Sequence, residues 1–386
     1  EWGNLLLRWA HMIVGIGWIG TSFYFVALDY SLNQKERKSP GVFGTAWQVH
    51  GGGFYHVEKF TVAPPHLPPH LHWFKWEAYL TWVTGFLLLV VQYYFNASAY
   101  LIDPAVAALT PWQAIAISVA GLVAGWLAYD ALCRSPLGRH TGLLATLVFA
   151  LILVAAYLFS QLFSGRGALI QTGAFIGTIM AANVFMIIVP NQRKITEALI
   201  AGKAPDPRYG AIGKQRSLHN TYLTLPVLLM MISNHYPMLT DHPLAWVIVV
   251  LIVICGTMLR FFLVRLEVGD RAADIAFALP VIATALALAL LMTEPDRAPA
   301  YQGEVSDAEA EAILVQRCAS CHAARPTDPT IKAPPKGIAL ETLADLTRYA
   351  AQVETQSVKN RAMPLGNKMG MTLEERAKLG AWIARR

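Results

Sequence analysis

The residues Cys318-Ala319-Ser320-Cys321-His322 decide how the C-terminal part of this chain folds. Two cysteines at this spacing, followed directly by a histidine, form the attachment pattern of a c-type haem. The thiols can form thioethers to the haem vinyl groups, and the imidazole can ligate the iron from one side. A redox dithiol and half of a zinc site are the alternatives, but the other cysteines, Cys133 and Cys255, lie far upstream in apolar segments. The motif therefore predicts covalent haem c held by Cys318, Cys321 and His322.

The sequence around the motif predicts a small helical domain at 303–386. Ser306-x-x-Glu309 and Thr372-x-x-Glu375 match capping boxes that start helices running to about 318 and 385, and a middle helix is expected over 341–357. This is the layout of a class I cytochrome c, with His322 as proximal ligand. Met363, directly before Pro364, is the expected distal ligand, because similar domains carry the ligand before a proline. Met369 and Met371 are rivals on the same loop.

The rest of the chain has the composition of a membrane protein. Of its 386 residues, 55% are apolar and 15% are charged, whereas an average soluble domain has about 25% charged residues. Lys and Arg in the loops of such a chain set its orientation, so the net charge of +6 does not indicate nucleic-acid binding. The expected surroundings are a lipid bilayer.

A helix needs about 20 mostly apolar residues to span a bilayer. Such runs occur at 2–28, 74–95, 111–132, 141–163, 168–190, 218–235, 243–265 and 272–293. The first is too long for a cleavable signal peptide and lacks a basic leader, so we expect it to be a span. The spacings Gly121-x-x-x-Gly125 and Gly173-x-x-x-Gly177 allow close helix contacts. The sequence therefore predicts an all-α fold, with an eight-helix transmembrane domain at 1–293, a linker at 294–302 and a cytochrome c domain at 303–386.

Basic residues gather in alternate loops. The loops after the first, third, fifth and seventh spans contain Lys35, Arg37, Lys38, Lys59, Lys75, Arg134, Arg139, Arg193, Lys194, Lys203, Arg208, Lys214, Arg216, Arg265 and Arg271. The other loops contain only Arg166. Because positively charged loops stay in the cytoplasm, both termini and the haem domain are predicted on the periplasmic side of a bacterial inner membrane.

Ionisable residues within the spans are costly in lipid, so each is a candidate for function. Arg8 and His11 lie on one face of the first span. For His11, two interpretations stay open, a ligand of haem or substrate and a hydrogen bond to a neighbouring helix. Arg260 and Asp274 are expected to pair across the bundle.

The first cytoplasmic loop is rich in His, Trp and Gly. It contains Trp47-Gln48-Val49-His50-Gly51-Gly52-Gly53, followed by Lys59 and His72. The glycines would let the backbone approach a ligand closely, and the aromatic rings with a lysine could hold a planar anion. A belt of interfacial aromatic residues would explain the same composition. His219, on the same side of the sixth span, could face this loop.

Several separate stretches resemble one family. HMIVGIGWIGTSFYF, VHGGGFYHVEK, LHWFKWEAYLTW, HNTYLTLPVLLMMISNHYP and the tail CASCH…MPLGN are similar to the bacterial membrane-bound urate oxidases fused to cytochrome c. The resemblance extends over essentially the whole chain. It implies oxidation of urate to 5-hydroxyisourate without release of hydrogen peroxide. The electrons would pass to haem c and then to a terminal oxidase or a soluble cytochrome.

Two positions are open for a urate site, which should offer a stacking ring, a cation, amide-type partners and a base. A pocket in the outer half of the membrane would use Arg8, His11, Arg166, Gln171 and His235. A pocket on the inner side would use His50, Lys59, His72 and His219. The apolar core is about 30 Å thick, so an inner pocket would need a relay such as haem b. We favour an inner contribution, with His50, Lys59, His72, His219 and His11 as candidate catalytic residues.

The competing interpretation is a protein without catalysis of its own. In it, the chain is a membrane-anchored cytochrome c subunit of a respiratory complex, and the spans only dock a partner.

Overall fold

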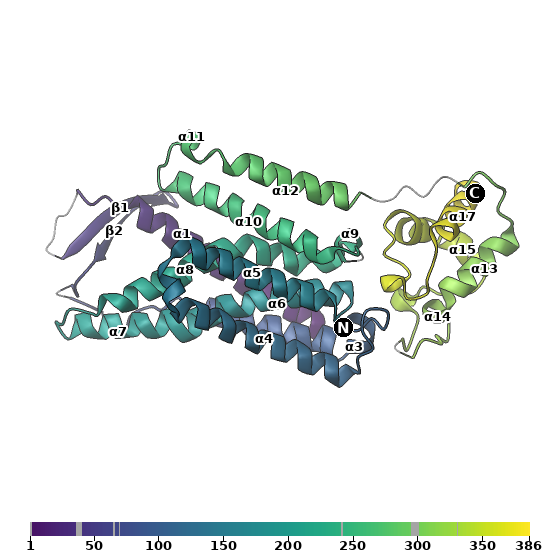
Figure 1. Ribbon diagram of the computed structural model, residues 1–386, viewed down its shortest axis with the longest axis horizontal. Helices are drawn as coiled ribbons and strands as arrows, with labels where there is room; N and C mark the ends of the chain where they lie inside the picture. Colours follow the sequence, from purple (N-terminus) through teal and green to yellow (C-terminus); the bar gives the residue numbers. More distant parts are fainter. Residues whose placement is uncertain are drawn as a thin grey trace.

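The computed structural model describes residues 2–35, 41–64, 66–68, 70–240, 242–294, 301–329 and 331–386. Most of them are helical, and the helices form a long bundle and a smaller C-terminal unit beyond one of its ends (Figure 1). The predicted linker at 294–302 lies largely outside the described residues.

Each of the eight apolar ranges contains a helix. The bundle consists of α1 (Trp2–Ser31), α2 (Trp76–Leu88) with η1 (Leu89–Tyr94), α3 (Ala97–Tyr100), α4 (Pro111–Arg134), η2 (Pro136–Arg139), α5 (Thr141–Ser160), α6 (Gly165–Ala182) with η3 (Asn183–Ile188) and α7 (Val189–Ile200), α8 (Pro207–Ile232), η4 (Ser233–His235), α9 (Pro237–Thr240), α10 (Ala245–Glu267), α11 (Ala272–Ile275) and α12 (Ala278–Met292). Five helices of the described chain are long and apolar enough to cross a membrane, namely Trp2–Ser31, Pro111–Arg134, Thr141–Ser160, Gly165–Ile200 and Ala245–Glu267.

Helix α6 lies at the centre of the bundle. It packs against α2, α4, α5 and α8, and its Phe175, Ile176 and Ile179 belong to the main buried core. By contrast, α1 packs mainly on α2, and α12 on α10. Exposed apolar side chains on these two outer helices, such as Trp9 and Leu291, suit contact with lipid.

Glycines set the spacing between the central helices. A Cβ built on Gly125 of α4 would lie 2.0 Å from Cε2 of Phe175 on α6, and one on Gly173 would lie 2.8 Å from Cβ of Met230 on α8. The spacing patterns of small residues therefore mark real helix contacts at these positions.

Residues 42–60 form a β-hairpin, so the expectation of an all-α fold is wrong for this segment. β1 (Val42–His50) and β2 (Gly53–Phe60) pair antiparallel, with His50 opposite Gly53. Gly51 and Gly52 have φ of +59° and +78°, as a two-residue type I′ turn requires. The glycine triplet thus builds a turn between strands rich in aromatic and β-branched residues.

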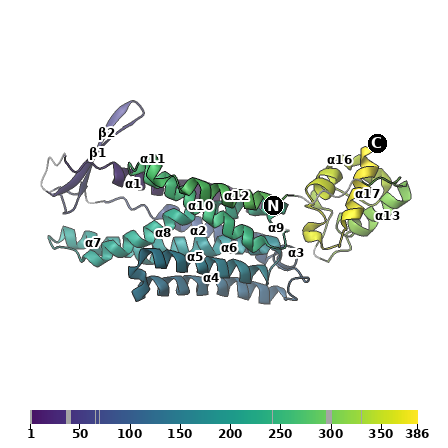
Figure 2. The same ribbon diagram turned by 45° about the horizontal axis from the view of Figure 1, so that its top comes forward.

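The two ends of the bundle differ. The hairpin, α7 and α11 lie at one end, whereas α3, α9, the N-terminus and the C-terminal unit lie at the other (Figures 1 and 2). The basic segments that contain Lys59, Arg193 and Lys194 are therefore at the end away from the C-terminal unit.

The C-terminal unit has its own helices and core. It contains α13 (Asp307–Arg317), α14 (Ala319–His322), η5 (Pro335–Gly337), α15 (Leu343–Arg348), α16 (Ala350–Val353), η6 (Glu354–Lys359), η7 (Leu365–Asn367) and α17 (Leu373–Ala384). Leu314, Leu346, Leu379 and Trp382 form the centre of its core. The predicted caps are confirmed, since Ser306 and Thr372 accept hydrogen bonds from the backbone N–H groups of Glu309 and Glu375.

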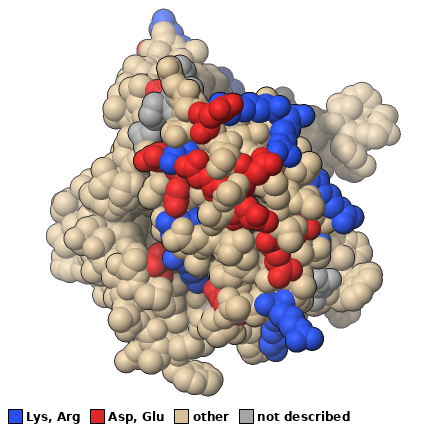
Figure 3. Space-filling view, turned by 90° about the vertical axis from the view of Figure 1, so that its right-hand side faces the viewer, with Lys and Arg blue, Asp and Glu red and all other residues tan. Residues whose placement is uncertain are grey.

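The C-terminal unit presents a charged surface. Figure 3 views it from the end away from the bundle, and acidic side chains gather across the middle of this face with basic ones around them. A hydrogen bond of 2.9 Å from Nζ of Lys368 to the carbonyl oxygen of Ser98 in α3 joins the unit to the bundle. The charged exterior suits water, and the apolar flanks of the bundle suit lipid.

Substitution of Gly125 by alanine is expected to lower the free energy of unfolding in detergent by about 1–3 kcal/mol, because the added methyl group would overpack the contact with Phe175. Denaturant unfolding followed by tryptophan fluorescence measures this change. Gly177→Ala is the matched control, since its Cβ would lie 3.9 Å from Val227 and both changes raise helix propensity equally. Equal stability of the two variants would contradict the close α4–α6 contact.

Candidate functional site

The Cys318–His322 motif forms one tight helical turn at the end of α13. The carbonyl oxygen of Cys318 accepts hydrogen bonds from the backbone N–H groups of Cys321 (3.2 Å) and His322 (2.9 Å). Cys318 is buried in the core of the C-terminal unit, Cys321 is half-buried, and both thiols are free. Two thiols and an imidazole therefore arise from the same short segment.

The His322 ring is held by a backbone carbonyl. Its Nδ1 lies 2.9 Å from the carbonyl oxygen of Ile338, so a proton on Nδ1 is donated to that oxygen. Such a bond orients the ring and leaves Nε2 available to a metal. The backbone N–H of Leu340 also donates to the carbonyl oxygen of His322, at 2.6 Å, which ties the motif to the 338–340 segment.

Three methionines follow on the 363–371 loop, and their surroundings differ. Met371 is buried in the core, and Sδ of Met369 accepts a contact of 3.4 Å from the Ser320 hydroxyl. The half-buried Met363 has its carbonyl oxygen held by Arg376 at 2.7 Å, while its backbone N–H donates to Gln356 at 2.9 Å. Met363 thus combines a fixed backbone with a side chain that is not part of the core.

The surroundings of the thiols do not suit dithiol chemistry. Burial raises the pKa of Cys318 to about 11, against the opposing effect of Arg376, and burial also raises the pKa of Cys321. Reactive dithiols instead need a lowered thiol pKa. Among the described residues, no group of three or more His, Cys, Asp and Glu side chains could hold a metal ion, so the zinc interpretation lacks ligands. The two thiols and the oriented His322 fit a c-type haem.

In the bundle, the structure brings Arg8 and Arg166 to one cluster. The guanidinium group of Arg8 on α1 donates to the side-chain oxygens of Gln92 and Asn4. Arg8 and, from α6, Arg166 both lie within electrostatic range of the hydroxyl of Tyr93 in η1. Arg8, Gln92, Tyr93, Arg166 and Asn234 are called the Arg8–Arg166 cluster below.

The Arg8–Arg166 cluster contains unsatisfied polar atoms. Nδ2 of Asn234 lies 3.5 Å from the Tyr93 hydroxyl, but its Oδ1 is buried without a hydrogen-bond partner. Nε of Arg166 is also buried and unpartnered. Within the described residues, neither Arg8 nor Arg166 forms an ion pair with a carboxylate. Gln92, Tyr93 and Asn234 were not predicted, although a polar residue inside an apolar run is itself a signal.

A second cluster, the Arg216 network, lies between α4, η3 and α8. It consists of Tyr129, Asp130, Asn183, Arg216, His219 and Asn220. The Tyr129 hydroxyl lies 2.7 Å from Nδ1 of His219 and accepts a hydrogen bond of 2.9 Å from Asn183. Arg216 forms an ion pair of 2.7 Å with Asp130, and its side chain is only 1% exposed. His219 therefore belongs to a network of mutually bonded groups, in which Nε of Arg216 is the one buried side-chain atom without a partner among the described residues.

Both clusters contain a π-helical segment. Gln92 and Tyr93 lie in η1 and Asn183 begins η3. A π-helical turn shifts the side chains that follow it around the helix axis and is frequent at functional sites. Sequence periodicity does not reveal these segments, because the flanking runs are apolar on all sides.

The candidates from the first cytoplasmic loop are not brought together with His219. His50 is exposed at the end of β1, and Lys59 on β2 pairs with Asp29 at 2.6 Å. His72 is exposed, with its ring 4.5 Å from that of Phe74. No described contact joins these side chains to the Arg216 network, in which His219 faces α4 and not the loop.

The remaining candidates of the outer pocket have separate roles. Nδ1 of His11 lies 3.0 Å from the Thr84 hydroxyl on α2, which agrees with the interhelical interpretation. Gln171 is fully buried and clamps α6 to Ser118 of α4, with bonds of 2.8 Å and 2.6 Å. His235 in η4 is exposed next to Asn234. Of the five outer candidates, only Arg8 and Arg166 share Tyr93 as a group within electrostatic range.

The expected pair of Arg260 and Asp274 is wrong. Arg260 is 2% exposed and lies over the Phe23 ring, 3.6 Å from its centre. Asp274 lies in α11, beyond the end of α10, whereas Arg260 is two turns inside α10. The ring of Phe23 therefore takes the place that a carboxylate was expected to fill.

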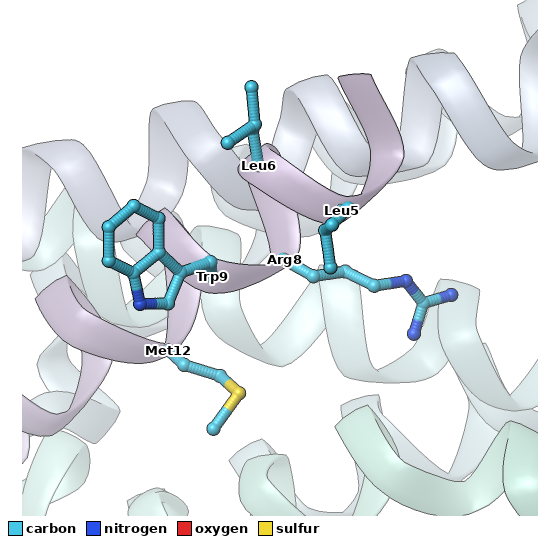
Figure 4. Close-up of a pocket in the computed structure, with 5 residues that line it drawn as sticks. All are labelled: Leu5, Leu6, Arg8, Trp9 and Met12. Atoms are coloured by element: carbon cyan, nitrogen blue, oxygen red, sulfur yellow. The ribbon is translucent and has the colours of Figure 1, made fainter. Parts of the chain in front are cut away.

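A shallow groove of about 350 Å³ lies on α1, lined by Leu5, Leu6, Arg8, Trp9 and Met12. Figure 4 shows that the guanidinium group of Arg8 points away from Trp9 and Met12. The groove is thus an exposed apolar face of one helix, and the charge of Arg8 is directed to the Arg8–Arg166 cluster instead.

Comparison with known proteins identifies the family of the bundle but gives no match for the C-terminal unit. No curated protein and no solved structure matches the chain significantly. A family model described as "Urate oxidase N-terminal" matches residues 1–293, which include all the helices of the bundle and both polar clusters. Since this match extends over well more than half of the chain, the protein belongs to the urate oxidase N-terminal family.

Proposed function

We propose that this protein is a membrane-bound urate oxidase that converts urate to 5-hydroxyisourate and passes the electrons to a haem c in its C-terminal unit. The observation that carries this proposal is the joining of two parts in one chain. Residues 1–293 match the urate oxidase N-terminal family, and the next folded unit contains Cys318, Cys321 and the oriented His322.

The proposed reaction balances without oxygen as the direct oxidant. Urate loses two electrons and two protons, and water supplies the hydroxyl group that forms the new C–O bond at C5. The electrons would pass to a haem c held by Cys318, Cys321 and His322, and then to a terminal oxidase or a soluble cytochrome. Because oxygen is not reduced at the urate site, hydrogen peroxide is not a product.

In the C-terminal unit, the chain's own residues hold and orient the redox group. The Cys318 and Cys321 thiols would form the two thioethers, and the Ile338 carbonyl would keep His322 directed at the iron. A c-type haem accepts one electron at a time, and a methionine ligand raises its potential. Arg376, bonded to the carbonyl oxygen of Met363, would position that methionine.

The bundle would span a bacterial inner membrane eight times. Five helices meet the length and hydropathy of a span, and α2 with η1, α8 and α12 would supply the other three. The hairpin and α7, with their basic residues, lie at the end away from the C-terminal unit (Figure 1). By the positive-inside rule, that end would be cytoplasmic, and the termini and the C-terminal unit periplasmic.

Addition of urate to the purified, oxidised protein under anaerobic conditions is expected to reduce its haem. The measurement is the visible absorption spectrum of the haem, with two equivalents of haem reduced per urate consumed. The membrane-anchored electron-transfer subunit predicts no reduction by urate, although ascorbate would still reduce the haem. If urate leaves the haem oxidised while ascorbate reduces it fully, the enzyme proposal is wrong.

Replacement of Met363 by leucine is expected to lower the midpoint potential of the haem, since the thioether ligand is lost. A redox titration measures this potential, and Met371→Leu serves as the control because Met371 packs in the core. A lowered potential in Met369→Leu alone would reassign the ligand to Met369.

The number and type of haems are tested separately. A pyridine haemochrome assay should show one haem c per chain, and it would reveal haem b if a relay is present.

A further inference from the structure

The charges of the Arg8–Arg166 cluster are not balanced by the protein. Arg8 donates to Gln92, the neighbour of Tyr93, and Nε of Arg166 is buried without a partner. Both guanidinium groups lie within electrostatic range of the Tyr93 hydroxyl, and no described carboxylate pairs with either of them. Unpaired charge within an apolar bundle is costly. A bound anion would balance the charge and reduce that cost.

The neutral groups of the cluster suit a flat, polar anion. Gln92 and Asn234 offer amide groups, and the buried Oδ1 of Asn234 is an acceptor without a donor. Nε of Arg166 is a donor without an acceptor. The Tyr93 ring, edge-on to Tyr100 with centroids 6.2 Å apart, adds aromatic surface. Urate presents N–H donors, carbonyl acceptors and one negative charge in a single plane, which are the complements of these groups.

The two buried arginines of the bundle, Arg216 and Arg260, do not offer the same chemistry. Arg216 already has Asp130 as its counter-ion, and His219, Tyr129, Asn183 and Asn220 bond to one another. Arg260 also has nitrogens without a partner, but the Phe23 ring covers it and the side chain is only 2% exposed. By contrast, Arg8, Arg166, Gln92 and Asn234 are only half-buried, so a ligand can reach them with less rearrangement.

The position of the cluster shortens the route of the electrons. Tyr93 lies five residues before Ser98, the residue of α3 whose carbonyl oxygen accepts from Lys368. Lys368 belongs to the loop that carries Met363. A ligand in the cluster would therefore lie at the end of the bundle that faces the C-terminal unit, and its electrons would not have to cross the apolar core.

We propose that the Arg8–Arg166 cluster is the urate-binding site, entered from the side of the membrane on which the C-terminal unit lies. Arg8 and Arg166 bind the anion, Gln92 and Asn234 orient its plane, and Tyr93 contacts the ring. The proposal rests on the function proposed above and makes a relay haem within the bundle unnecessary.

Equilibrium binding of radiolabelled urate to the full-length protein tests the site. The haem is first reduced anaerobically, so that bound urate cannot react. Arg166→Gln and Arg8→Gln are each expected to weaken binding about 10- to 100-fold, as expected for loss of one charge-assisted hydrogen bond. Arg139→Gln, in the loop before α5, is the control that keeps wild-type affinity.

Loss of binding in the arginine variants could also result from misfolding, and Asn234→Asp tests the site without that problem. It keeps the size of the side chain but supplies a carboxylate for the two arginines, so the protein is expected to be at least as stable as the wild type. Urate binding should nevertheless fall, because the anion then meets a neutralised site. Unchanged affinity in Asn234→Asp would overturn the proposal.

Two further readouts separate this site from the proposed function. If urate reduces the haem of the wild type and of both arginine variants at equal rates, the function holds and the site is wrong. The same conclusion follows if His219→Ala or Arg216→Gln abolishes binding while the arginine variants of the cluster keep it. If urate binds through Arg8 and Arg166 but never reduces the haem, the site holds and the enzyme proposal fails.

Discussion

A charged side chain between apolar helices needs a partner, and this requirement organises the bundle of this protein. The Arg216 network meets it internally, because Asp130 neutralises Arg216 and the surrounding amides, tyrosine and histidine bond to one another. Arg260 lies over an aromatic ring, although its Nε and one terminal nitrogen are buried without a partner. The Arg8–Arg166 cluster differs in that it has two guanidinium groups without a described carboxylate, together with a buried amide oxygen that lacks a donor. All three places contain buried or half-buried arginines. What distinguishes the candidate site from the structural contacts is therefore how the arginine charge is paired.

Irregular helix geometry places these groups. The π-helical segments η1 and η3 each supply polar side chains to one cluster, Gln92 and Tyr93 in the first case and Asn183 in the second. Glycines such as Gly125 and Gly173 let the flanking helices approach closely enough for the remaining polar groups to meet. Close packing and local irregularity thus act together, since short polar side chains cannot bridge widely spaced helices.

The two parts of the chain divide the proposed chemistry. The bundle offers binding groups for a planar anion, while the C-terminal unit offers thiols and an oriented imidazole for a redox group. The contact between Lys368 and Ser98 lies where these two parts meet. An electron acceptor next to the substrate site would make the thickness of the membrane irrelevant to the transfer, because the electrons would start and end on the same side.

The sequence by itself determined what depends on composition and local spacing. The helical character, the helices in the eight apolar ranges, the caps at Ser306 and Thr372, the close glycine contacts and the Cys318–His322 turn all follow from patterns within a few residues. The hairpin at 42–60 was missed because its Gly-Gly turn was interpreted as a ligand-binding loop. Only the tertiary structure decided that Arg8 and Arg166 lie near Tyr93 without a described carboxylate while Arg216 has one. Asp130 and Arg216 are 86 positions apart, and no local pattern encodes which charges become neighbours when helices pack.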